Sequence, residues 1–278
     1  MIKLVINVRK ASVVRCEYRF KLGSLAVDYT SQYRYLGFTF GETLDYAVGV
    51  NELLTAGCRA LGALVSKYFK LDGLDYETYT KPFDSNVTPI IEHGSGVWGF
   101  KEYDGLNRLQ NRAIRSYLGT GKFTPISALT GEMGWIPLYV RTHCQMVKLW
   151  CRIVSMHKDR IPLRIFLWDS HFSGTHSDTW TTNVKSIMYG CGFNSKTSDG
   201  LSGRFIGEVV KGTLLQKHQN KWTVSIKSIP KLRTYTTLNI IYSVQPYLKT
   251  NISRQERSVI ARLRCGVLPL HIGARMAP

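Results

Sequence analysis

Acidic residues are scarce in this sequence, and aspartates are never paired. The 278 residues include 19 Asp or Glu against 37 Lys or Arg, a formal net charge of +18. No two aspartates are adjacent, so the sequence lacks the grouped carboxylates that two-metal phosphoryl transfer needs to hold both ions. We therefore expect no catalytic residue of that kind.

Cysteine pairs at metal-binding spacing are also missing. None of the six cysteines forms a Cys-x-x-Cys pair, which argues against a structural zinc site. Cys144 and Cys151 are seven residues apart and would share one helix face, a pattern typical of two small core residues. The sequence predicts neither a bound metal nor a cofactor.

Long apolar runs are absent as well. No run of about 20 apolar residues is present to span a bilayer. Residues 1–10 alternate like a strand and lack the apolar core of a signal peptide. We therefore expect no membrane partner and no secretion, and an intracellular location, in the nucleus or the cytoplasm, follows as the default.

The excess of positive charge lies mostly toward the end of the chain. Residues 204–278 contain 13 Lys or Arg and two Glu, a net charge of +11. Such a surplus repels itself, and an anionic partner explains it most simply. Aromatic residues interleaved with these charges favour nucleic acid, because bases stack on such rings: Trp222, Tyr235, Tyr242 and Tyr247. A solvated basic surface and an anionic membrane surface are the alternatives.

Hydrophobic periodicity predicts a mainly α protein, with a small antiparallel β-sheet before the helices and a basic, mostly helical C-terminal region. Alternating apolar residues predict four short strands within 2–40. Helical spacing then predicts helices over 45–70, 76–93, 104–118, 125–131 and 138–156, with Pro162 ending this block. The stretch 168–203 is expected to be a linker with a short helix near 182–190, and helices follow over 205–225 and 253–264.

A stripe of arginines marks the expected helix over 104–118. Arg108, Arg112 and Arg115 are spaced four and three residues apart, so they lie on one face. These charges repel each other unless something anionic lies beside them, and phosphates of a nucleic-acid backbone would suit them. A solvated charged face is the alternative.

The next long helix repeats the arrangement. Arg141, Lys148 and Arg152 share one stripe of the expected helix over 138–156. Two basic stripes on neighbouring helices could line one side of a nucleic-acid groove. The same pattern would also suit two helices at the rim of a subunit interface.

Four short motifs occur in a fixed order along the chain. They are Tyr33-Arg34-Tyr35-Leu36-Gly37, the run from Ile90 to Gly99, Leu109-Gln110-Asn111-Arg112-Ala113-Ile114-Arg115, and Gly131-Glu132-Met133-Gly134-Trp135-Ile136-Pro137. Together they resemble the back half of a non-LTR retrotransposon reverse transcriptase, from the end of the palm through the thumb into the linker. Two later runs, Lys231 to Tyr235 and Arg257 to Leu270, resemble the region after the thumb in metazoan members.

The resemblance implies four segments and a set of site residues. Residues 1–40 would be a β segment from the palm end and primer grip, 41–165 a helical thumb-like domain, 166–203 a linker, and 204–278 the basic helical region. Tyr35, Leu36 and Gly37 match the primer-grip hairpin, which holds the primer end in reverse transcriptases. Thumb positions are matched by Trp98, Gln110, Asn111, Arg112 and Trp135, of which the two tryptophans are expected to pack rather than to contact nucleic acid.

Two departures from the family pattern shape the expected function. The paired-aspartate turn of the palm is missing, with no room for it before Met1, and the last motif leads into no Cys/His zinc knuckle. The resemblance therefore implies a truncated retroelement product that binds RNA–DNA or primer–template duplex without catalysis. The alternatives are a fragment that completes an RNA-directed DNA polymerase in trans with an upstream palm polypeptide, and a host-adopted protein-interaction module.

Overall fold

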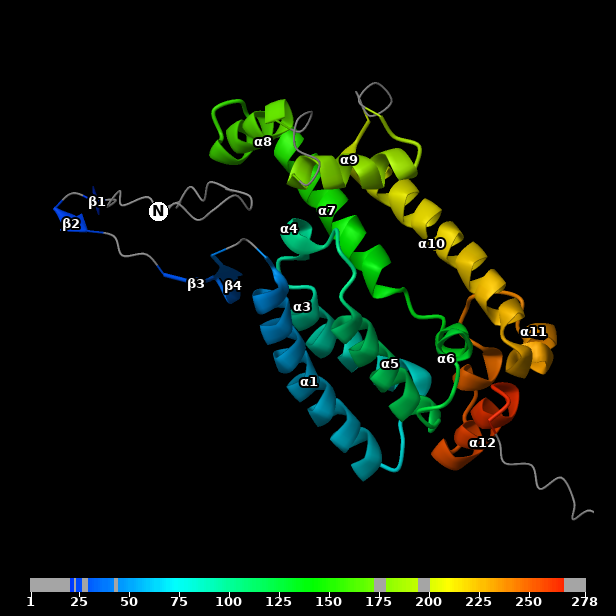
Figure 1. The fold of residues 1–278 in the computed structure, drawn as a ribbon. Helices are drawn as coiled ribbons and strands as arrows, with labels where there is room; N and C mark the ends of the chain where they lie inside the picture. Colours follow the sequence, from blue (N-terminus) through cyan, green and yellow to red (C-terminus); the bar gives the residue numbers. More distant parts are fainter. Residues whose placement is uncertain are drawn as a thin grey trace, which may run out of the picture.

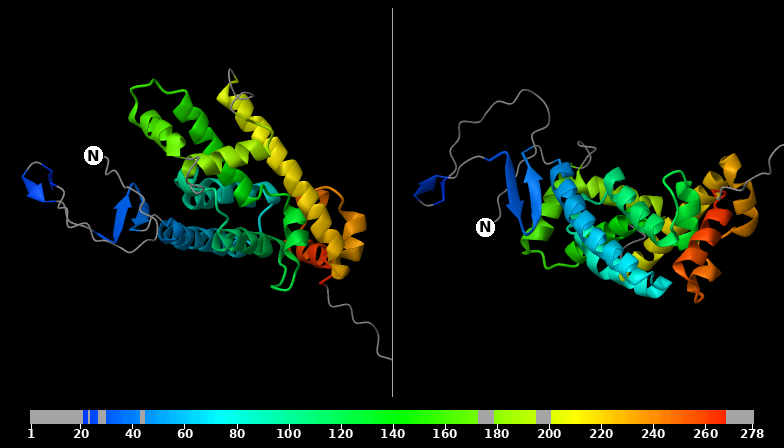
Figure 2. Two further views of the ribbon diagram at one scale, coloured as in Figure 1. Left: turned by 45° about the horizontal axis from the view of Figure 1, so that its top comes forward. Right: turned by 90° about the horizontal axis from the view of Figure 1, so that it is seen from below.

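The computed structural model describes residues 21–22, 24–26, 30–42, 45–172, 179–194 and 201–267. This part of the chain is mainly helical, with short antiparallel hairpins before the first helix, which confirms the expected fold class. One hairpin lies at the N-terminal end of the first long helix, and the other lies further out, apart from the helical body (Figures 1 and 2).

Two hairpins precede the helices. β1 (Lys21–Leu22) pairs antiparallel with β2 (Leu25–Ala26), and β3 (Gln32–Tyr35) pairs antiparallel with β4 (Phe38–Gly41). The described residues thus form two separate two-stranded sheets rather than one sheet of four strands, and the strands expected before residue 21 lie outside them. Leu36 and Gly37 connect β3 to β4 with φ of 47° and 86°, the left-handed backbone that suits a two-residue hairpin turn.

The stretch from 47 to 154 forms helices close to the expected ranges. They are α1 (Ala47–Lys70), α2 (Tyr76–Pro82), the π-helical turn η1 (Phe83–Val87), α3 (Thr88–Ile91), α4 (Ser95–Trp98), α5 (Asp104–Leu118), α6 (Ile126–Met133) and α7 (Leu138–Val154). The predicted helix over 76–93 is therefore divided, with Pro89 in the first turn of α3. Gly119 and Gly134 end α5 and α6 in the left-handed conformation that glycine adopts without strain.

The C-terminal half continues with α8 (Ile161–Phe172), α9 (Trp180–Gly190), α10 (Gly203–Ser228), η2 (Pro230–Leu232), α11 (Arg233–Leu238), η3 (Pro246–Lys249) and α12 (Arg254–Arg264). Pro162 was expected to end the helical block, but it lies in the first turn of α8, where its missing N–H leaves no bond unmade. Residues 166–203, expected as a linker, contribute α9 and most of α8 to the packed body, with Val184 and Met188 buried.

Three clusters of buried apolar side chains hold the helices together. The first joins α1, α2, α3 and α5 and contains the mutually packed rings of Tyr68, Tyr79 and Tyr117. The second joins α7, α9 and α10. The third joins α6, α10 and α11 around Trp222 and Tyr235. Because α6 also contributes to the first cluster, and α7 to the first and second, these two helices link the three clusters.

α1 is long and apolar enough to cross a membrane by length and composition alone, with a mean hydropathy of 1.2 over an 18-residue window. A core helix of a globular protein passes the same test. In the fold, one face of α1 packs into the first cluster, with Val50, Leu53, Leu61 and Tyr68 buried. This packing accounts for the apolar stripe.

The two cysteines of α7 lie where their spacing predicted. Cys144 is buried in the second cluster, and Cys151 packs against the same cluster about two turns further along the same helix face. Burial raises the pKa of both thiols, which keeps them protonated at neutral pH. The expectation of two small core residues is confirmed.

Two glycines offer a matched test of this packing. A Cβ at Gly134, where φ is 60°, would lie 2.2 Å from the backbone nitrogen of Val244, whereas a Cβ at Gly62 in α1 would meet nothing within 4 Å. We expect Gly134→Ala to lower the free energy of unfolding by at least ~2 kcal/mol. Gly62→Ala should instead raise it by about 0.5–1 kcal/mol, since alanine restricts the unfolded chain. Urea denaturation measures both, and equal effects would contradict the described packing.

Two histidines bracket the contact between α7 and α10. The ring of Tyr139 lies 5.8 Å from the rings of both His143 and His218. Burial lowers the pKa of His143, and burial together with nearby Lys221 lowers the pKa of His218 to about 4. Both imidazoles are therefore neutral in the folded protein at neutral pH.

These depressed pKa values predict a loss of stability in mild acid. In the unfolded chain both histidines titrate near their ordinary pKa of about 6.5. Below that pH the unfolded state therefore binds more protons than the folded state. The free energy of unfolding should therefore fall as pH drops from about 6.5 toward 4. Substituting His218→Gln should flatten this slope. Urea denaturation at several pH values between about 4 and 7 measures this slope. If the slope is the same in His218→Gln as in the unaltered protein, the prediction is wrong.

Candidate nucleic-acid interface

α5 presents an apolar face to the core and a basic face to solvent. Leu106, Leu109, Ala113 and Tyr117 are buried, as the helical spacing predicted. On the opposite side Arg108 and Arg112 are exposed, whereas Arg115 is only partly exposed. The structure therefore places two of the three predicted arginines fully on the outer face.

The charges of these arginines are not neutralised by the part of the chain that the structure describes. Asp104 lies four residues before Arg108, at the spacing of a helical ion pair, but the recorded contact runs from Arg108 Nε to the backbone carbonyl of Asp104 at 3.3 Å. Arg112 has no ion pair among the described residues. Arg115 differs, because its Nε is buried without a hydrogen-bond partner and burial lowers its pKa.

The stripe on α7 is divided by an internal ion pair. Arg141 Nη2 donates to Asp84 Oδ1 at 2.8 Å, and Arg141 Nε lies 3.9 Å from Glu92 Oε1. η1 and the end of α3 bring these two acids against α7, so the charge of Arg141 is balanced within the fold. Lys148 and Arg152 remain exposed.

The two stripes lie on helices that contact each other, and none of the stripe cations lines the small hollow between α5 and α7. α5 packs chiefly on α1, while α7 packs chiefly on α4 and α10. Arg152 borders a hollow between α7 and α9, to which no α5 residue contributes. The described structure thus has an exposed pair of cations on α5 and another on α7, and a single groove across both stays a prediction.

The β3–β4 hairpin presents Tyr35, Leu36 and Gly37 at its tip. Leu36 is 75% exposed, and Tyr35 stacks on Tyr33 with 6.4 Å between ring centroids. The tip is held in place, since His93 Nε2 lies 2.8 Å from the Leu36 carbonyl oxygen. The predicted primer-grip residues are thus accessible on a fixed turn.

The other side of the hairpin is docked on the helices. Phe38 is buried and stacks on Trp98, and Thr39 Oγ1 donates to Glu52 Oε2 on α1 at 2.7 Å. A Cβ on Gly49 would lie 2.5 Å from the Phe38 ring, so this glycine allows α1 to approach the hairpin. The hairpin is consequently positioned by α1 and α4.

The matched thumb residues divide into packing residues and one exposed arginine. Trp98 and Trp135 are buried, which confirms that both pack, and Trp98 Nε1 donates to the His93 carbonyl oxygen at 2.9 Å. Gln110 and Asn111 are buried too, and Gln110 Nε2 donates to the Ile136 carbonyl oxygen at 3.0 Å. Of this set, Arg112 alone reaches the surface.

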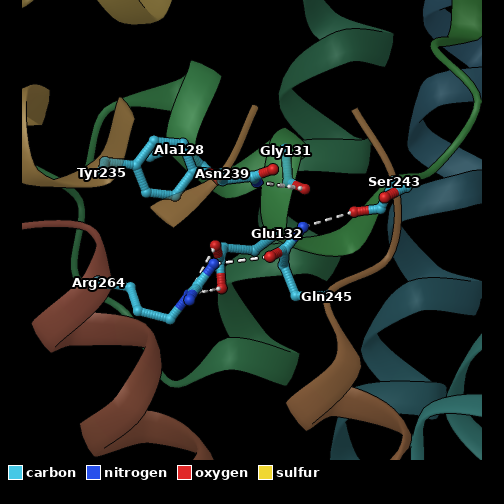
Figure 3. A network of polar contacts seen from close by, with 8 residues as sticks. All are labelled: Ala128, Gly131, Glu132, Tyr235, Asn239, Ser243, Gln245 and Arg264. Atoms are coloured by element: carbon cyan, nitrogen blue, oxygen red, sulfur yellow. Dashed lines mark hydrogen bonds and ion pairs between the residues drawn. The ribbon is translucent and has the colours of Figure 1, made fainter. Parts of the chain in front are cut away.

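A buried network that the sequence did not reveal joins two of the quoted motifs (Figure 3). Glu132 on α6 is 0% exposed, and Arg264 Nε on α12 donates to both of its carboxylate oxygens at 3.1 and 3.0 Å. Arg264 Nη2 also donates to Gln245 Oε1, whose backbone N–H donates to the Glu132 carbonyl. Burial raises the pKa of Glu132 while Tyr247 and Arg264 oppose that shift.

The same network extends to α11. Asn239 Nδ2 donates to the Tyr235 hydroxyl at 2.7 Å and to the Gly131 carbonyl at 3.3 Å, and the Tyr235 hydroxyl donates to the Ala128 carbonyl (Figure 3). A Cβ on Gly131 would lie 2.5 Å from the Trp222 ring. The Gly131–Trp135 motif is therefore a docking point for the C-terminal helices rather than a contact surface for a ligand.

A second buried arginine was also missed. Arg257 is 2% exposed and donates to the Leu74 carbonyl and to the hydroxyls of Tyr117 and Tyr68 at 2.9–3.0 Å. Its guanidinium carbon lies 4.0 Å from the centroid of the Tyr117 ring. Nothing in the spacing of the α12 cations distinguishes it from the exposed Arg262, because the difference lies in what α12 packs against.

No family model, curated protein or solved structure matches this chain. Within the described ranges no three His, Cys, Asp or Glu side chains gather at metal-binding distance. The function of this chain is therefore inferred from the geometry and charge of the surfaces described above.

The division between internal and surface arginines predicts different effects on stability. Arg141→Gln leaves Asp84 and Glu92 without their cation and should lower the free energy of unfolding by about 1–3 kcal/mol. Arg108→Gln removes an exposed charge and should change it by less than about 0.5 kcal/mol. Thermal and urea denaturation compare the two variants, and a larger loss in Arg108→Gln would refute the assignment.

Proposed function

We propose that this chain binds nucleic acid through backbone phosphates and does not itself catalyse synthesis. The exposed face of α5 carries the proposal, with Arg108 and Arg112 as its phosphate contacts. Such contacts fix the position of a duplex and read no sequence. The resemblance to the thumb of a non-LTR reverse transcriptase favours RNA–DNA or primer–template duplex as the ligand.

One observation supports this most directly. Four of the acids lie beside arginines of another element: Asp72 with Arg254, Asp84 and Glu92 with Arg141, and Glu132 with Arg264. The cations of the outer α5 face have no such acid among the described residues. Exposed cations without a partner attract a polyanion and release its counterions.

The hairpin favours a nucleic-acid end near α1. Tyr35 and Leu36 are exposed on a turn whose carbonyl is fixed by His93. An aromatic ring beside a rigid turn can stack on a sugar or a terminal base. This arrangement supports a primer-grip-like role for Tyr35, Leu36 and Gly37.

A polymerase completed in trans is the second candidate. Gln32 to Gly37 are all exposed, so the hairpin offers its β3 edge to a further strand from another polypeptide. In that case synthesis would require an added palm polypeptide that supplies paired aspartates. Primer extension by the mixture, and not by either part alone, would favour this candidate.

Salt-dependent binding tests the phosphate role. We expect the affinity for an RNA–DNA hybrid to fall steeply as the salt concentration rises. In Arg108→Gln/Arg112→Gln the slope of log affinity against log salt concentration should be smaller by about one unit for each lost phosphate contact. The double variant should bind about tenfold more weakly at low salt. Filter binding across salt concentrations provides the measurement.

A charge-matched control isolates position from net charge. Lys81→Gln/Lys158→Gln removes two exposed cations from α2 and from the loop before α8. Its affinity and slope should stay near those of the unaltered protein. If both double variants bind the hybrid with the same affinity and salt slope, or if the hybrid does not bind at low salt, the α5 face is not the interface. If the α5 variant instead binds the hybrid normally and loses a protein partner, the chain is better explained as a protein-interaction module.

A further inference from the structure

We propose that a second, separate site binds single-stranded nucleic acid in the hollow bordered by α7, α8, α9 and the start of α10, here named the α7–α10 hollow. Its volume is about 960 Å³, and its described walls come from residues within 150–155, 166–170, 185–194 and 201–206. The hollow lies away from α5, which contributes none of its lining. This site goes beyond the duplex contacts proposed for Arg108 and Arg112.

Aromatic rings form much of the wall. Trp150 on α7, Phe166 on α8, Tyr189 on α9 and Phe193 after it all line the hollow. Tyr189 is 77% exposed, so its ring is accessible to an occupant of the hollow. Base rings stack on such side chains whatever their sequence, and each stacked base contributes strongly to affinity.

One hydrogen-bond donor in this wall is unused. Trp150 Nε1 is buried and has no hydrogen-bond partner. An indole N–H is a donor only, and buried donors are normally paired. Because this atom is not exposed to solvent, it lies behind the surface of the hollow and makes no contact with an occupant.

The charge of the lining selects an anion. Arg152 and Lys185 are its charged residues, and none of the described lining residues is Asp or Glu. Arg152 belongs to the α7 stripe that was expected to contact nucleic acid. The cations would bind the phosphate of a nucleotide, and the aromatic rings would stack on its base.

The shape favours a single strand over other occupants. A duplex keeps its bases stacked inside and cannot offer them to rings in a hollow of this size. A fatty acid, the other apolar anion, suits an enclosed apolar pocket, whereas this wall includes the polar side chains Ser155, Lys185 and Asn194. Unpaired bases with flanking phosphates fit both features.

The test uses the full chain and a fluorescent oligouridine, measured by anisotropy at low salt. Tyr189→Ala/Lys185→Gln should weaken oligouridine binding about tenfold, as the loss of one stacking ring and one phosphate contact predicts. Binding of the RNA–DNA hybrid should stay unchanged, because that ligand is assigned to α5. Failure at one site is thus distinguishable from failure at the other.

Two controls make the outcome decisive. Phe123→Ala/Lys122→Gln removes an equally exposed ring and a cation from the loop after α5, where the Lys122 ammonium lies 5.0 Å from the Phe123 ring centroid. This variant should bind oligouridine normally. An abasic strand of the same charge should bind more weakly than oligouridine. The proposal is overturned if the abasic strand binds equally well, if both variants lose equal affinity, or if dodecanoate binds the hollow and oligouridine does not.

Discussion

A carboxylate sealed from solvent joins the two halves of this protein. Glu132 at the end of α6 accepts two hydrogen bonds from Arg264, and through Gln245 and Asn239 the same network fixes the chain between α11 and α12. A buried ion pair is costly to break, because either partner alone would be left as an uncompensated charge. The orientation of the C-terminal helices against α5 and α6 follows from this contact.

The pairing of inner cations within the fold also accounts for the unpaired positive charge on the surface. Beside the Glu132–Arg264 pair, two further arginines anchor α12: Arg257 donates to the Leu74 carbonyl in the loop between α1 and α2, and Arg262 donates to the Gly119 carbonyl at the C-terminus of α5. Positive charge at a helix C-terminus is favoured by the backbone dipole. Carbonyls and internal acids thus balance the inner cations, while Arg108, Arg112 and the rim of the α7–α10 hollow remain available to phosphate.

Local patterns in the sequence predicted the elements well and the partners poorly. Regular apolar spacing and end glycines such as Gly119 located α1, α5, α7 and α12, because these signals lie within one helix. Helical spacing predicted the same exposed position for Arg108 and for Arg141. It could not show that Arg141 pairs with Asp84, because Asp84 is 57 residues away in the sequence. Glu132 and Arg264 are 132 residues apart, and no local pattern couples them. α9 lies where a short helix near 182–190 was expected, whereas α8 was not predicted, because none of its described residues is fully buried and so it leaves no apolar stripe in the sequence. Duplex binding stays a prediction from the resemblance and the α5 face.

Arginine-selective modification read by mass spectrometry tests the central claim, that inner cations hold the fold and outer ones face a polyanion. In the free protein Arg108 and Arg112 should react with phenylglyoxal, whereas Arg257 and Arg264 should not. Added RNA–DNA hybrid should protect the first pair and leave the second unreactive. Equal reactivity of Arg108 and Arg112 with and without hybrid, or rapid modification of Arg257 and Arg264, would contradict the account.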